Sequence, residues 1–245
     1  MTVRAVFFDV FGTLMPYKNL PRHEVLAKRA NLVGLSLSAE QVRAALHKLE
    51  SDSMGFAMAG QLASEDVPRD RTYWVRTFGN VLKAAGVQGS QDVIDAYATD
   101  MCDTFLQVGD FYLDEETLPT LRGLKQQGFT VAVISNAPKG LAKTLEQYGV
   151  LQELAFAVGS QDIGIEKPDP AIFNYALQAT GFAAAESAYV GDEYMTDARA
   201  AQAAGMYGIF LDRHGLKPVS DVPRIRRLSD LLGADSPLRN GSQHI

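Results

Sequence analysis

Cysteine, an excess of basic residues and long apolar runs are all scarce or missing in this sequence. The 245-residue chain has one cysteine, Cys102, so no internal disulfide can form, which fits a reduced compartment. Lysine and arginine total 23 against 29 for aspartate and glutamate, and no basic tract suits nucleic acid or an anionic membrane surface. No run approaches the roughly 18 apolar residues of a membrane span. The first residues lead straight into a strand pattern rather than a signal peptide. We expect a cytoplasmic protein with no nucleic-acid or membrane partner.

The hydrophobic content is what the chain has in quantity. At 47% it is enough for one large core, or for a core with a smaller second domain. From about residue 115 onward, strand-like runs alternate with helix-like runs, which is typical of parallel βα units. The expected strands cover residues 3–8, 130–135, 155–159, 187–191 and 207–211, and the expected helices cover 115–127, 140–148, 171–180 and 196–204. The pattern predicts an α/β fold with a doubly wound, Rossmann-like parallel sheet of five strands.

Residues 16–110 interrupt that pattern after the first strand. They show helical spacing and few strand signals, and they are rich in alanine, leucine, glutamate, lysine and glutamine. The expected helices cover residues 23–32, 38–54, 70–85 and 91–106. We therefore predict an α/β catalytic core formed by residues 1–15 and 111–245, with an inserted all-helical cap at 16–110. Pro16 and the segment 107–114 would be its hinges. Such an insertion can act as a lid over the carboxyl end of a parallel sheet.

Polar residues follow the ends of four expected strands or lie in the loops behind them. Parallel strands bring all these ends to one edge of the sheet, so residues far apart in sequence can meet there. The residues are Asp9 with Thr13, Ser135 with Asn136, Lys167 in Lys-Pro-Asp-Pro, and Asp192 with Asp197 in Gly-Asp-Glu-Tyr-Met-Thr-Asp. Each alone also has a structural explanation, for example Asp9 as a turn cap, Lys167 as a surface lysine and Asp197 as a helix cap. Their convergence favours catalysis.

This set suits the hydrolysis of a phosphate ester. Asp9 can attack phosphorus and form an aspartyl-phosphate, provided that positive charge offsets the repulsion between carboxylate and phosphoryl group. Lys167 and a metal would supply that charge. Mg²⁺ prefers oxygen ligands, so Asp9, Asp192 and the backbone carbonyl of Phe11 could bind it while Asp197 orients its waters.

Three further side chains could bind the substrate. Thr13 and Ser135 offer hydroxyls, and Asn136 offers an amide, to the phosphoryl oxygens.

Together these motifs resemble the haloacid dehalogenase superfamily of aspartate-nucleophile hydrolases. The similarity is to the subfamily I branch, whose helical cap lies between the first and second motifs. The motifs are Asp-Val-Phe-Gly-Thr, Val-Ile-Ser-Asn, Lys-Pro and Gly-Asp followed by a second aspartate, and they span nearly the whole chain. The resemblance implies that Asp9 is the nucleophile, that Thr13, Ser135 and Lys167 position the phosphate, and that Asp9, Asp192 and Asp197 serve the metal.

One position departs from the family pattern. Phosphatase members carry an acid two residues after the nucleophile, where this chain has Phe11, and loss of a general acid typically costs roughly 10²–10⁴ in rate. We favour an Mg²⁺-dependent phosphohydrolase of a small phosphorylated metabolite, limited to good leaving groups or using an acid from the cap such as His23, His47 or Tyr17.

Two other functions remain open. A 2-haloacid dehalogenase also has an aromatic residue at this position but lacks the metal carboxylate that Asp192 provides. A catalytically impaired binding or regulatory protein could keep every motif. The sequence leaves the substrate and the oligomeric state undetermined.

Overall fold

The computed structural model describes residues 2–16, 22–58, 71–104, 111–215 and 221–240. The chain divides into two compact units. Met1–Pro16 and Phe111–Ile245 form the first, and Tyr17–Asp110 form the second.

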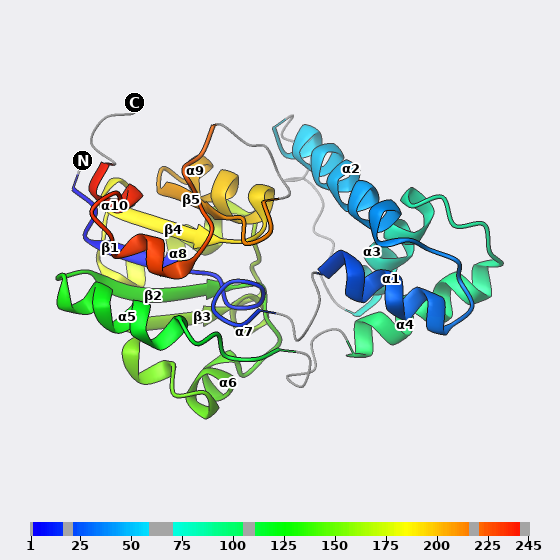
Figure 1. The fold of residues 1–245 in the computed structure, drawn as a ribbon, viewed down its shortest axis with the longest axis horizontal. Helices are drawn as coiled ribbons and strands as arrows, with labels where there is room; N and C mark the ends of the chain where they lie inside the picture. Colours follow the sequence, from blue (N-terminus) through cyan, green and yellow to red (C-terminus); the bar gives the residue numbers. More distant parts are fainter. Residues whose placement is uncertain (1, 17–21, 59–70, 105–110, 216–220, 241–245) are drawn as a thin grey trace. The chain divides into compact units, whose positions relative to one another are not determined.

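The first unit is built on a six-stranded parallel sheet with the order β3-β2-β1-β4-β5-β6 (Figure 1). Residue Phe8 of β1 pairs with Val133 of β2 and Val190 of β4, so the residues that follow these strands meet at one edge. The strands are β1 (Ala5–Phe8), β2 (Thr130–Ser135), β3 (Phe156–Gly159), β4 (Ser187–Gly191), β5 (Tyr207–Leu211) and β6 (Arg224–Ile225).

Successive side chains of a strand point to opposite faces of the sheet. Because the central strands β1 and β4 are buried along their length, helices cover both faces. Ala132 and Ile134 of β2 belong to a core shared with Phe173 of α8 and with α9. Val131 and Val133, which alternate with them, therefore face the other side, where α5 contacts β2. The helices are α5 (Thr117–Gln126), α6 (Leu141–Gln147), α7 (Ser160–Ile163), α8 (Pro170–Thr180), α9 (Ala200–Ala203) and α10 (Pro237–Asn240), with 3₁₀ turns η3 (Leu151–Glu153), η4 (Ala184–Glu186) and η6 (Leu228–Leu231).

The predicted α/β class and parallel sheet are confirmed, with two corrections to the elements. The sheet has six strands rather than five, because β6 is a two-residue strand too short to give a sequence signal. The helix expected at 196–204 is instead a π-helical turn, η5 (Tyr194–Arg199), followed by α9. This wider turn carries Asp197, whose backbone N–H donates to the carbonyl of Glu193 at 2.8 Å.

The second unit is helical throughout the part that the structure describes. Its helices are α1 (Arg22–Leu32), α2 (Ala39–Met58), α3 (Arg71–Ala84) and α4 (Gln91–Thr104), one for each helix expected there. They share an apolar core that includes Leu26, Leu82 and Met101. The buried hydroxyl of Tyr97 in α4 donates to the Leu26 carbonyl of α1 at 3.0 Å. Within the described ranges of both units, no helix is both long enough and apolar enough to span a bilayer.

Candidate active site

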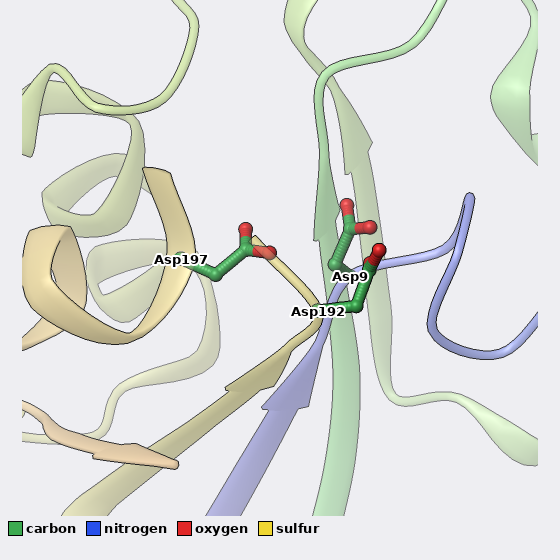
Figure 2. Close-up of side chains that lie close together, drawn as sticks. All are labelled: Asp9, Asp192 and Asp197. Atoms are coloured by element: carbon green, nitrogen blue, oxygen red, sulfur yellow. The ribbon is translucent and has the colours of Figure 1, made fainter. Parts of the chain in front are cut away.

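Three carboxylates gather at the carboxyl edge of the sheet in the first unit. Asp9 directly follows β1, Asp192 directly follows β4, and Asp197 lies on η5. Each can offer an oxygen such that the three oxygens lie within 4.8 Å of one another. Figure 2 shows Asp9 and Asp192 side by side at the strand ends, with Asp197 beside them on its helical turn.

Asp9 is held at this edge by backbone and side-chain bonds. Its N–H donates to the Val190 carbonyl at 2.9 Å, which continues the pairing of β1 with β4. Its Oδ1 accepts from Ser135 Oγ at 2.9 Å and from Lys167 Nζ at 2.8 Å. Among the residues that the structure describes, every side-chain hydrogen bond to Asp9 goes to Oδ1. Oδ2 is therefore the oxygen left for another partner.

Lys167 lies at the centre of the cluster and is only 3% exposed. Its Nζ donates to Asp9 Oδ1 at 2.8 Å and to Asp197 Oδ1 at 2.6 Å. Burial opposes the charged form of Lys167, but the charges of Asp197 and Asp9 outweigh it and raise the pKa. Lys167 is therefore an ammonium group at neutral pH.

The backbone of Lys167 is fixed from both sides. Asn136 Nδ2 donates to the Lys167 carbonyl at 2.8 Å, and the Lys167 N–H donates to Asn136 Oδ1 at 2.8 Å. Immediately afterwards Asp169 caps α8 by accepting from the Ala171 N–H, and Pro170 occupies the first turn. The Lys-Pro-Asp-Pro sequence thus ends one loop and starts a helix while its lysine points into the site.

Asp192 is bonded to the loop that follows Asp9. Thr13 Oγ1 donates to Asp192 Oδ1 at 2.9 Å. Gly12 has φ 98°, and a Cβ there would lie 2.3 Å from Asp192 Oδ2, so this close approach requires glycine. Burial, and then the charge of Asp9, raise the pKa of Asp192 to about 7.

Asp197 uses both of its carboxylate oxygens within the described residues. Oδ1 accepts from Lys167, and Oδ2 accepts from the Glu193 N–H at 2.9 Å. A Cβ on Gly191 would lie 2.2 Å from Asp197 Oδ2, so the glycine in Gly-Asp makes room for this carboxylate. Burial raises the pKa of Asp197 to about 7, although the charge of Lys167 lowers it.

The donor set fits a hard divalent cation. Three carboxylates face one ammonium group, which leaves a formal excess of two negative charges in a largely buried cluster. An Mg²⁺ ion would offset that excess, and its preferred ligands are carboxylate oxygens. The residues present therefore match the cation expected from the sequence.

The ring of Phe11 packs against another aromatic ring. Its centroid lies 4.6 Å from that of Phe111, which is fully buried. The position for which the resemblance implies an acid is thus occupied by a ring in an aromatic contact within the first unit. The roles suggested for His23 and His47 stay predictions, since both lie in the second unit, and Tyr17 lies outside the described residues.

Two contacts at this edge were not anticipated from the sequence. Tyr189 of β4 is fully buried, and its hydroxyl accepts from Lys167 Nζ at 2.8 Å. Arg213 Nη2 donates to the Thr13 carbonyl at 2.9 Å, and its Nη1 pairs with Asp114 at 2.9 Å. A tyrosine three residues before Asp192, inside a strand that is buried throughout, is the one signal that could have drawn attention to Tyr189.

This chain belongs to the haloacid dehalogenase-like hydrolases. The model of that family matches residues 3–205, which confirms the resemblance at family level and the prediction of a hydrolase. A relative from Danio rerio, haloacid dehalogenase-like hydrolase domain-containing protein 3, is 28% identical over 223 residues and covers 90% of each chain. Glyceraldehyde 3-phosphate phosphatase from Methanopyrus kandleri is 28% identical over 252 residues, covering 94% of this chain and 97% of the relative.

Solved structures share the same fold. The HAD phosphatase from Thermococcus onnurineus superposes with a TM-score of 0.55 at 21% identity, covering 94% of this chain and 96% of its own. The 2-haloacid dehalogenase from Pseudomonas syringae gives a TM-score of 0.53 at 26% identity with the same coverage. A protein named as a phosphatase and one named as a dehalogenase therefore share one architecture, so the fold does not decide between the two activities.

Proposed function

We propose that this protein is an Mg²⁺-dependent phosphohydrolase that cleaves a small phosphorylated metabolite through an intermediate on Asp9. The arrangement around Asp9 carries the proposal. Lys167 and Ser135 both bind Oδ1, while Oδ2 keeps no hydrogen bond among the described residues. A carboxylate held by one oxygen presents the other as a nucleophile of fixed direction.

Two displacements complete the reaction. In the first, Asp9 Oδ2 forms a bond to phosphorus, and the bond from phosphorus to the leaving oxygen breaks with its electron pair. In the second, the oxygen of a water molecule forms a bond to phosphorus, and its proton passes through solvent to the leaving-group anion released in the first step. The bond from phosphorus to Oδ2 breaks with its electron pair, which restores the Asp9 carboxylate and releases inorganic phosphate. Lys167 is placed to offset the charge of Asp9 as the phosphoryl group approaches.

The three carboxylates would hold the metal, with different roles for each. Bound Mg²⁺ would supply positive charge at the phosphoryl oxygens. We assign direct binding to Asp9 and Asp192, together with the Phe11 carbonyl. Asp197 accepts from Lys167 and from the Glu193 N–H, and we assign it to orienting water bound to the metal.

The polar residues expected to bind substrate divide into two groups. Ser135 and Thr13 donate their hydroxyl protons to Asp9 and Asp192, so each hydroxyl would have to turn from its carboxylate to donate to a phosphoryl oxygen. The amide of Asn136 is bonded at both its oxygen and its nitrogen to the Lys167 backbone. We therefore propose that Asn136 acts on substrate through Lys167.

The leaving group is the point at which Phe11 matters. With an aromatic residue in place of the acid, the leaving oxygen must depart as an anion or take a proton from the helical unit. We propose that residues 16–110 form a cap of the subfamily I kind, and that the preferred substrates have good leaving groups. The phosphatase names of relatives such as that from Methanopyrus kandleri support a small phosphorylated substrate.

The first test follows phosphate and chloride release in parallel, with and without Mg²⁺. The substrates are p-nitrophenyl phosphate, an alkyl phosphate and L-2-chloropropionate. Mg²⁺-dependent phosphate release from the aryl ester, abolished in a folded Asp9→Asn variant, supports the proposal. Full activity of that variant defeats the nucleophile assignment. Metal-independent chloride release identifies a dehalogenase, and silence on all three substrates leaves a narrow substrate requirement or a binding role.

The role of Phe11 has its own matched pair of variants. Phe11→Asp restores an acid, and we expect alkyl phosphate hydrolysis to rise by about tenfold or more. Phe11→Asn loses the same ring contact with Phe111 without supplying a proton, so it should not show that gain. Equal rates in the two variants would mean that another group already donates the proton, or that chemistry does not limit the rate.

A further inference from the structure

Tyr189 places a hydroxyl group against the catalytic lysine from inside the sheet. The side chain is fully buried. Its hydroxyl donates to the Ile134 carbonyl at 2.6 Å and accepts from Lys167 Nζ at 2.8 Å. The hydroxyl also lies 3.5 Å from Asp197 Oδ1, but the shorter contact assigns its one proton to the Ile134 carbonyl and leaves an oxygen lone pair for the ammonium group.

The position of Tyr189 in the sheet makes this contact unusual. Tyr189 belongs to β4 and Ile134 to β2, and β1 lies between these strands. The tyrosine side chain therefore reaches past the strand that carries Asp9. Its ring meets the ring of Phe173 edge-on, with centroids 5.2 Å apart, which fixes its orientation from the α8 side.

The hydroxyl gives the ammonium group a neutral acceptor beside two carboxylates. An ammonium has three N–H donors, and Lys167 directs them to Asp9 Oδ1, Asp197 Oδ1 and Tyr189 Oη. Two acceptors alone would let the group swing about the line between the carboxylates. A neutral third acceptor removes that freedom without neutralising the charge that a phosphoryl group needs.

We propose that Tyr189 is a positioning residue that sets the ammonium group of Lys167 against Asp9. The last residues of β2 then act on Lys167 as a set. Ile134 holds it through Tyr189, Ser135 shares its acceptor on Asp9, and Asn136 holds its backbone. The expected effect on catalysis rests on the phosphohydrolase function proposed above, whereas the positioning of the ammonium group by Tyr189 does not.

Tyr189→Phe tests this, and Tyr97→Phe is its matched control. Both substitutions remove a buried hydroxyl that donates to a distant backbone carbonyl, but Tyr97 lies in the helical unit and donates to Leu26. With saturating Mg²⁺ and p-nitrophenyl phosphate, we expect kcat of Tyr189→Phe to fall about 10- to 100-fold. Loss of one hydrogen bond to a charged group typically changes a rate by about this factor. KM should change by less than about twofold, because a contact that orients Lys167 in the transition state affects kcat and not substrate binding. Tyr97→Phe should keep kcat and lose only thermal stability.

A second readout needs no activity. With ¹⁵N-labelled lysine, a buried ammonium held by three acceptors should give a slowly exchanging NMR signal in the wild type and in Tyr97→Phe. The signal should broaden or disappear in Tyr189→Phe. If the wild type hydrolyses no phosphate, the proposed function fails and this spectrum alone decides the positioning role. An unchanged Lys167 signal in Tyr189→Phe, or a kcat equal to wild type with only a lower Tm, would overturn the inference.

Discussion

The two ends of β1 and β4 carry charged groups in opposite settings. Before these strands, Arg4 and Glu186 form an ion pair at 3.0 Å with side chains that are 61% and 38% exposed. At the other end, Asp9 follows β1 and forms an ion pair at 2.8 Å with Lys167 from the loop before α8, and these side chains are 8% and 3% exposed. The same two neighbouring strands thus present a solvated pair at one edge and a buried cluster at the other.

The difference shows what burial does to a charge. When two exposed charged side chains form an ion pair, each gives up contacts with water, so the pair adds little to the free energy of unfolding. A buried cluster loses its hydration, so each charge depends on its partners, and removal of one partner leaves the others uncompensated. At the carboxyl edge three carboxylates face one ammonium group, and this excess of negative charge does not stabilise the fold. It suits the binding of a cation and, with it, a phosphate group.

The largest effect should come from Lys167→Met. This change removes the cation that faces Asp9 and Asp197, and loss of one partner from a buried ion pair typically costs roughly 3–5 kcal/mol. We expect a clear loss of unfolding free energy in urea with EDTA present, together with loss of turnover. Lys139→Met, at an exposed position in the same unit, should leave both unchanged. A Lys167→Met variant as stable as wild type would show that the buried cluster does not depend on its cation.

Asp192→Asn should give a smaller effect that depends on pH. Folding raises the pKa of Asp192 from 3.8 to about 7, so between these values the folded state binds more protons than the unfolded state. Stability of the metal-free wild type therefore falls as pH rises through this window and changes no further above it from this source. Asparagine removes the penalty. We expect the metal-free variant to melt a few degrees above wild type at pH 8, with the gap closing near pH 4.

Magnesium should reverse that order at pH 8. Added Mg²⁺ should raise the Tm of wild type and raise that of Asp192→Asn much less, because the variant loses a proposed ligand. Asp235→Asn, at an exposed position, should follow wild type in every condition. A gap between Asp192→Asn and wild type that is the same at pH 4 and pH 8 would exclude the raised pKa as its cause.

The sequence allowed much of this edge to be anticipated, for a definite physical reason. Asp9 and Asp192 directly follow apolar strands, and parallel pairing brings such ends together whatever lies between them. Tyr189 could not be anticipated in the same way. The alternation of residues along a strand shows which face of the sheet a side chain lies on, but not that a long side chain reaches across the neighbouring strand. The position of Asn136 after β2 predicts a contact with substrate, whereas its bonds to Lys167 depend on how a distant loop returns to β2.

The smallest effect should come from the opposite edge of the sheet. Arg4→Ala, Glu186→Ala and the double variant each remove part of the exposed pair before β1 and β4, while the Arg4 N–H can still donate to the Glu186 carbonyl. We expect Tm within about 2 °C of wild type for all three, and no coupling beyond error in the double-mutant cycle. Thermal melts at low and high salt measure this, and phosphate release should be unaffected. A coupling as large as the loss in Lys167→Met would show that the difference in burial between the two edges does not determine how much their ion pairs contribute to stability.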